Sequence, residues 1–274
     1  MTQVSVIQWT SGSDPQQNLD QLRTLVRLLP KQRPQLVVVP EAFACFGAGE
    51  AQQCDLAEQL GQGPIQEAVA ALAKQHDLWI VAGTIPIQAG ARYAAAALLF
   101  DNQGQQVARY DKIHLFDAVV EDGTGNYLES KYTQPGSELT VVDTPFGRLG
   151  MAVCYDLRFP EMFRALRQQG AELIVLPSAF TQVTGQAHWQ PLLQARAIEN
   201  QCYMVAPNQG GVHPDGRETW GHSMIIDPWG KVCTEISSDI GVGSTSIDAT
   251  RIRDIRRRMP VETHNQFKAV FKHA

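Results

Sequence analysis

ELIVLPSAFTQVTGQAHWQPLLQARAIENQCYMVAP, residues 172–207, is the stretch that decides the fold. Its two ends, ELIVLP and CYMVAP, are short, continuous apolar runs, a pattern typical of strands that are buried on both faces. Residues 186–199 between them predict a helix. A strand, a helix and a second strand in this order predict a layered α/β fold in which helices cover sheets.

The same alternation continues toward both ends of the chain. Asp14 followed by Pro15 predicts the start of a helix that runs to about Leu29. Further strands are predicted at VSVIQW (4–9), QLVVVP (35–40), LWIVAGTIPI (78–87), LTVVDTPF (139–146), RLGMAVCY (148–155) and GVGSTSID (241–248), and helices at 64–75, at 160–169 and from about Ala249. Turns at 102–104 and 228–230 predict hairpins, and therefore mixed sheets. Residues 113–138 contain few periodic apolar positions and predict a long loop.

Composition narrows the class of protein. The chain has 274 residues, 44% of them hydrophobic, and no linker-like segment, which favours a single domain over residues 1–274. Its net charge of −5 argues against a nucleic-acid partner. One basic stretch, RIRDIRRR at 251–258, is short, and we interpret it as the solvated face of a C-terminal helix.

The cellular location is predicted from what the sequence lacks. The start MTQVSVIQWT is unlike a signal peptide, and no apolar run reaches the roughly 20 residues that span a bilayer. The five cysteines are odd in number and form no C-x-x-C pair, which favours free thiols over disulfides or a zinc site. We therefore expect a cytoplasmic protein that binds no membrane.

Cys154 is the first candidate for chemistry. It closes the apolar run GMAVC and precedes a predicted helix that starts at Pro160. A thiol at such a junction can be exposed, and a helix N-terminus favours its thiolate form. A lone cysteine is more often a buried structural residue, and we assign the other four cysteines to that class because none shows the same junction.

Glu41 and Lys112 also follow predicted strands. Glu41 comes directly after QLVVVP beside apolar residues, so desolvation should raise its pKa and suit it to act as a general base. Lys112 ends the strand QQVARYDK, where its ammonium could stabilise an oxyanion or lower the pKa of a thiol. Each could instead be an ordinary surface residue. Together with Cys154 they supply a nucleophile, a base and a cation, as amide hydrolysis requires.

The contexts of these three residues resemble the nitrilase superfamily of carbon–nitrogen hydrolases. Its motifs appear in order as VVVPEAF, RYDKIHLF and GMAVCYDLRFPE. The resemblance implies a four-layer α-β-β-α sandwich that pairs into homodimers or larger homo-oligomers. It also implies that no cofactor or metal is needed.

The resemblance also assigns roles. Cys154 would be the nucleophile and Glu41 the general base, while Lys112 and the backbone N–H of Tyr155 would stabilise the oxyanion. A second glutamate of the family falls at Glu129, where it would position the lysine and the substrate.

The C-terminal half resembles one branch of the superfamily. PSAFTQVTGQAHW, LLQARAIENQCYMVAPNQGG and GHSMIIDPWG are similar to amidases that act on deaminated glutathione and, less closely, to ω-amidases that act on α-ketoglutaramate. Both substrates are small anionic α-keto acid amides. Arg158 is therefore our candidate for binding the substrate carboxylate, unless it only pairs with an acidic neighbour. Thr181 and His188 are candidates for the pocket wall.

Several other functions fit the same residues. A nitrilase, an N-carbamoyl hydrolase and an acyltransferase that passes the acyl group to an amine or lipid share these residue types. A binding protein that has lost catalysis is a further alternative, although all four positions are intact. Assays on amides, nitriles and carbamoyl compounds would separate these functions.

Overall fold

The computed structural model describes residues 2–122 and 125–267, and its main strands form two six-stranded sheets. The first contains β1 (Thr2–Gln8), β2 (Gln35–Val38), β3 (Trp79–Ala89), β4 (Arg92–Phe100), β5 (Gln106–Asp111) and β16 (Gly241–Ile247), in the order β16-β1-β2-β3-β4-β5. The second contains β8 (Thr140–Thr144), β9 (Gly147–Met151), β10 (Leu173–Val175), β11 (Tyr203–Ala206), β14 (Ser223–Ile226) and β15 (Val232–Ile236), in the order β15-β14-β11-β10-β9-β8. In each sheet three parallel strands are flanked by antiparallel ones, so the predicted mixed sheets are confirmed.

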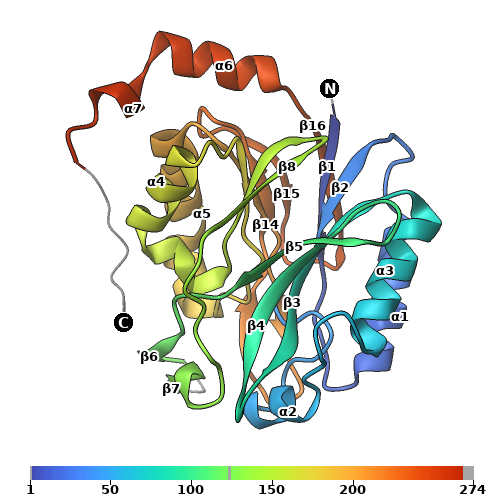
Figure 1. Ribbon diagram of the computed structural model, residues 1–274. Coiled ribbons are helices and arrows are strands. Elements are labelled where there is room, and N and C mark those ends of the chain that lie inside the picture. The colour runs from blue at the N-terminus through green and yellow to red at the C-terminus, as the bar shows by residue number, and fades with distance from the viewer. Residues whose placement is uncertain (1, 123–124, 268–274) are drawn as a thin grey trace.

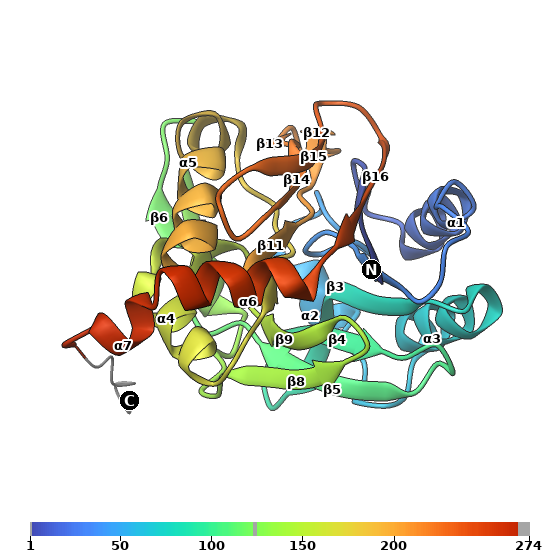
Figure 2. The ribbon, with the colours of Figure 1, turned by 90° about the horizontal axis from the view of Figure 1, so that it is seen from above.

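Helices cover the outer face of each sheet. These helices are α1 (Pro15–Val26) and α3 (Pro64–His76) on the first sheet and α4 (Pro160–Gln168) and α5 (Gln182–Asn200) on the second. The view from above shows the two sheets stacked between these helix pairs (Figures 1 and 2), which confirms the predicted α-β-β-α sandwich. The other helices are α2 (Glu50–Asp55), α6 (Ala249–Arg258) and α7 (Val261–His264). Within the described residues no helix has the length and apolar character needed to cross a membrane.

Strand β2 illustrates why the sequence folds into four layers. Leu36 and Val38 point into the core between the two sheets, whereas Val37 and Val39 lie in the core beneath α1 and α3. All four side chains are fully buried. Burying one such side chain stabilises the fold by about 1.5–3 kcal/mol. An uninterrupted apolar run is therefore required of a strand that has protein on both faces.

The predicted loop at 113–138 proves to be partly ordered into strands. It contains a small hairpin, β6 (Asp117–Val119) and β7 (Asn126–Leu128), followed by a 3₁₀ turn at Glu129–Lys131. These strands have three residues each and are half-exposed, so they carry too little apolar periodicity to be predicted. The hairpin β12 (Gly210–Val212) and β13 (Glu218–Trp220) was not predicted for the same reason.

Two helix boundaries differ from the prediction by three residues or more. Helix α5 begins at Gln182, four residues before the predicted start, because the Thr181 side chain accepts a hydrogen bond from the N–H of Thr184 and caps it. Helix α1 ends at Val26 instead of about Leu29, although Asp14 caps its N-terminus as predicted.

The basic stretch at 251–258 forms α6 and packs on the body of the protein. Ile252 and Ile255 are buried. Arg251 forms a 2.6 Å ion pair with Asp227, and the guanidinium of Arg256 donates to the carbonyl of Ala171 at 2.7 Å. Two of the arginines in this stretch therefore stabilise the packing of α6 on the second sheet and its flanking segments.

Candidate active site

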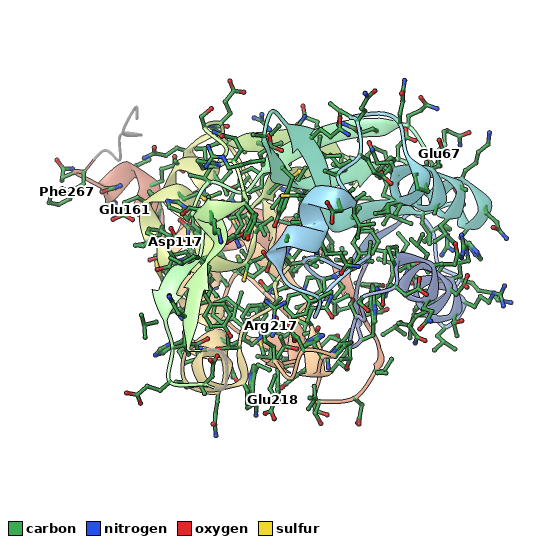
Figure 3. The ribbon with its side chains drawn as sticks, turned by 90° about the horizontal axis from the view of Figure 1, so that it is seen from below. Glu67, Asp117, Glu161, Arg217, Glu218 and Phe267 are labelled. Carbon is green, nitrogen blue, oxygen red and sulfur yellow. The ribbon has the colours of Figure 1, made fainter. Side chains whose placement is uncertain are left out.

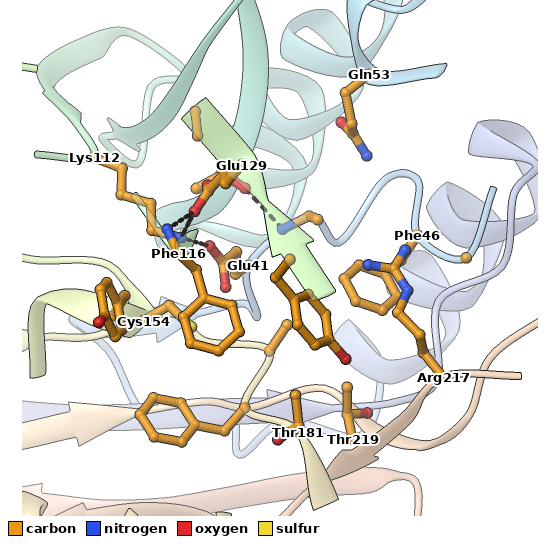
Figure 4. Close-up of a pocket in the computed structure, with 18 of the residues that line it drawn as sticks. Glu41, Phe46, Gln53, Lys112, Phe116, Glu129, Cys154, Thr181, Arg217 and Thr219 are labelled. Carbon is orange, nitrogen blue, oxygen red and sulfur yellow. Dashed lines mark hydrogen bonds and ion pairs between the residues drawn. The ribbon is translucent and has the colours of Figure 1, made fainter. Parts of the chain in front are cut away.

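The three strand-end residues predicted from the sequence lie in one cavity. Glu41 follows β2, Lys112 follows β5 and Cys154 follows β9, and all three line a cavity of about 400 Å³ together with Glu129. Figure 4 shows the carboxylates of Glu41 and Glu129 directed at the ammonium of Lys112, with Cys154 nearby. The cavity therefore combines a thiol, an ammonium and two carboxylates from both sheets.

The backbone after β2 turns sharply to present Glu41. Ala42 has a positive φ of 52°, and its N–H donates to the Thr84 hydroxyl at 2.8 Å. A Cβ atom at Gly83 would lie 1.8 Å from the carbonyl oxygen of Pro40, so only glycine permits this approach of the two chains. The Glu41 side chain remains only 10% exposed.

Lys112 is held by both carboxylates. Its Nζ donates to Oε1 of Glu41 at 2.8 Å and to both carboxylate oxygens of Glu129, at 3.0 and 2.8 Å. Burial alone would lower the pKa of Lys112, but the negative charges of Glu129 and Glu41 raise this pKa well above its usual value. The side chain therefore stays an ammonium in a nearly water-free position.

Glu129 occupies the 3₁₀ turn that follows β7. In addition to the bonds from Lys112, its carboxylate accepts a 2.6 Å hydrogen bond from the backbone N–H of Phe116. Burial raises the pKa of Glu129 to about 7, against the opposing effect of the Lys112 charge. This carboxyl group is therefore poised to change its protonation state near neutral pH.

Cys154 occupies a strained position. Strand β9 ends at Met151, and Cys154 begins a 3₁₀ turn with a φ of 48°, in the left-handed region that few residues other than glycine adopt. Its N–H donates to the carbonyl of Pro177 at 2.9 Å. The turn places the sulfur in the cavity instead of continuing the strand.

The expected stabilisation of a Cys154 thiolate is not found. Burial, followed by the negative charge of Glu41, raises the pKa of Cys154 well above its ordinary value, and the charge of Lys112 offsets this only in part. The resting group is therefore a neutral thiol. Glu41 is close enough for its negative charge to act on this thiol, so a base lies near the proton that must be removed.

Asp156 connects the segments that carry Lys112 and Cys154. This carboxylate is fully buried and accepts hydrogen bonds from the hydroxyl of Tyr110 at 2.7 Å and the N–H of Val153 at 2.8 Å. Nδ1 of His114 lies 2.7 Å from its other oxygen. Tyr110 and His114 flank Lys112 in the chain, so Asp156 fixes the lysine relative to the turn of Cys154.

Three of the four predicted substrate-binding residues line the cavity, and the fourth contacts one of them. Tyr155, Arg158 and Thr181 line the cavity. Arg158 lies over the rings of Tyr155 and Phe180, at 5.9 and 5.5 Å from their centroids, and no acidic partner of Arg158 occurs in the part of the chain that the structure describes. His188 is not among the residues that line the cavity. It contacts Arg158, with 3.3 Å between Nδ1 and Nη1.

The cavity also includes residues that the sequence analysis missed. The main ones are Phe46, Gln53, Thr84, Phe116, Tyr127, Arg217 and Thr219. Thr84 lies within β3, and the others come from the loop after Glu41, from α2, from the residue before β6, and from the small hairpins β6–β7 and β12–β13. None of them follows a long predicted strand, so the rule that located Glu41 and Cys154 could not find them.

The fold and the cavity agree with the comparison to known proteins. The chain matches the carbon–nitrogen hydrolase family over residues 3–257 and therefore belongs to that family, as its three motifs predicted. It is an enzyme that acts on amides.

Similar proteins cover nearly the whole chain. A deaminated glutathione amidase of Yersinia enterocolitica is 46% identical over 96% of this chain and 93% of its own length. The human deaminated glutathione amidase is 41% identical, over 96% of this chain and 82% of its own length. The crystal structure of the NitFhit protein of C. elegans superimposes with a TM-score of 0.89 at 37% identity, covering 97% of this chain and 65% of that one.

Proposed function

We propose that this protein hydrolyses the amide of a small α-keto acid amide, with deaminated glutathione as the best substrate. The observation that carries the proposal is the buried group of Cys154, Glu41 and Lys112 in one cavity. The names of its similar proteins support the choice of substrate.

The reaction begins with attack by sulfur. Cys154 gives its proton to Glu41 while its sulfur adds to the amide carbon, and the resulting oxyanion is stabilised by the ammonium of Lys112 and the backbone N–H of Tyr155. Glu41 then returns the proton to the amide nitrogen. The C–N bond breaks, the amine leaves, and a thioester on Cys154 remains.

Water completes the cycle. Glu41 removes a proton from a water molecule while the oxygen of that water adds to the thioester carbon. The second tetrahedral intermediate then collapses to the carboxylic acid. The departing sulfur takes back the proton from Glu41. Through its contacts with Lys112, Glu129 keeps the ammonium directed at the oxyanion in both steps. In this scheme Arg158 binds the α-keto carboxylate, and Thr181 and His188 support that end of the cavity.

A panel of substrates tests the proposal. We expect kcat/KM for deaminated glutathione to exceed that for α-ketoglutaramate by about tenfold or more, because it offers additional groups for contact. Nitriles and N-carbamoyl compounds should react more slowly than either amide. Release of cysteinylglycine and ammonia, measured by mass spectrometry and a coupled assay, gives the rates. A nitrile turned over faster than both amides would contradict the proposal.

The activity should depend on the protonation of Glu129. We expect kcat/KM to fall as the pH decreases through about 7, because a protonated Glu129 loses its charge interaction with Lys112. Glu129→Gln should be less active and should lack this acid limb of the pH–rate profile. Finding the same limb in both proteins would assign the titration to another group.

Four further expectations stay predictions. These are a single domain over residues 1–274, a cytoplasmic location, a homodimer or larger homo-oligomer, and a small-molecule substrate as the main partner. Sedimentation velocity measures the oligomeric state directly, and a purely monomeric protein at micromolar concentration would contradict that expectation.

A further inference from the structure

The cavity extends well beyond the reacting groups. Figure 4 shows Phe46, Gln53 and Arg217 at the end of the cavity opposite Cys154. Arg217 and Glu218 also lie on the face of the molecule seen from below (Figure 3). This far end gives room for a leaving group larger than ammonia. A primary amide, which releases only ammonia, would leave it unused.

The position of Glu41 indicates which part of the substrate, the acyl group or the leaving amine, binds at the far end of the cavity. Under the proposed mechanism Glu41 protonates the departing nitrogen, so the leaving amine lies on the side of Glu41. The chain that follows Glu41 supplies the next parts of the cavity wall, Ala42, Phe46 and Gly47. Arg158 instead follows the nucleophile, beside the rings of Tyr155 and Phe180.

The guanidinium of Arg217 is held in a defined orientation at the far end. It lies 4.3 Å from the centroid of the Phe46 ring, and its Nε donates to Oδ2 of Asp215 at 2.7 Å. The Arg217 side chain is only 13% exposed. Because a guanidinium has five N–H donors in a rigid plane, it can hold Asp215 through Nε and exchange other contacts for an incoming carboxylate.

We propose that Arg217 is a specificity-determining residue that binds a carboxylate on the leaving amine. The inference rests on the proposed function and deepens it. Deaminated glutathione has two carboxylates, one on the α-keto acid and one on the terminal glycine of the leaving dipeptide. Arg158 and Arg217 would receive one each, from opposite sides of the amide that is cleaved. α-Ketoglutaramate lacks the second carboxylate.

Arg217→Gln tests this assignment with two substrates. We expect its kcat/KM for deaminated glutathione to fall about 10- to 100-fold more than its kcat/KM for α-ketoglutaramate, the range for losing a hydrogen bond to a charged group. Arg158→Gln should lower kcat/KM for both substrates and leave the ratio of the two kcat/KM values nearly unchanged. Arg257→Gln, which removes an exposed charge on α6 far from the cavity lining, should leave both activities at the wild-type level.

A modified substrate tests the same contact without changing the fold. Converting the glycine carboxylate of deaminated glutathione to a carboxamide should lower kcat/KM of the wild-type enzyme by a similar factor, with little further loss in Arg217→Gln. Arg217→Lys, which keeps the charge, should recover part of the loss. A substrate ratio that stays unchanged in Arg217→Gln would overturn this inference alone. A wild-type enzyme that does not cleave deaminated glutathione would overturn the proposed function and the inference together.

Discussion

Cys154→Ala is expected to lower the turnover of an active amide by at least about 10⁴-fold, because the described residues that line the cavity include no second thiol. The side chain is small and lies in a turn, so the variant should fold. Its φ of 48° is fixed by the surrounding hydrogen bonds and not by the sulfur. The residual turnover of the variant should be measured as product release at an enzyme concentration near that of the substrate, so that very slow turnover can be detected.

Cys233→Ala is the matched control for the loss of a thiol. Cys233 is exposed on β15 and does not line the cavity, so its replacement should leave turnover within about twofold of wild type. Acid quenching of the wild-type reaction should trap the acyl group on Cys154, visible as added mass on the peptide that contains it. Wild-type turnover by Cys154→Ala would remove the assignment of the nucleophile.

Lys112→Ala is expected to reduce kcat by about a hundredfold or more, since the oxyanion loses its charged donor. The same change leaves Glu41 and Glu129 facing each other without a cation in a buried site. Breaking such a buried pair typically destabilises a protein by about 3–5 kcal/mol. We therefore expect a lower midpoint of thermal unfolding together with the loss of turnover.

The two effects of Lys112→Ala can be separated. kcat should be measured well below the unfolding midpoint of the variant, so that only folded enzyme contributes. Lys131→Ala changes an exposed lysine in the turn that carries Glu129 and should retain both kcat and stability. An effect of Lys112→Ala on KM alone would contradict a role in stabilising the transition state.

The four-layer fold was predictable because its inner strands are buried on both faces. QLVVVP and ELIVLP are apolar without interruption, and the observed strands β2 and β10 lie within them. The elements that were missed include α2 and the hairpins β6–β7 and β12–β13, which are short and partly exposed. Their conformation depends on tertiary contacts, so local sequence periodicity does not indicate it.

The residues of the candidate site that follow long strands were predictable, and those on loops and short hairpins were not. Glu41, Lys112 and Cys154 follow strands, and the edge of a sheet brings strand ends together. Arg217 and Phe46 meet only because two separate loops fold against each other. The protonation of the Cys154 thiol was not predictable, because its burial and its distance from Glu41 depend on how the two sheets stack.

Glu41 and Lys112 follow strands of one sheet, whereas Cys154 follows a strand of the other. A nascent or heat-damaged chain in which the two sheets have come apart therefore leaves the sulfur without its proton acceptor. We expect such a chain not to hydrolyse amides. Amide hydrolysis is therefore a property of the completed sandwich, because only the stacked sheets bring the thiol, the carboxylate and the ammonium together.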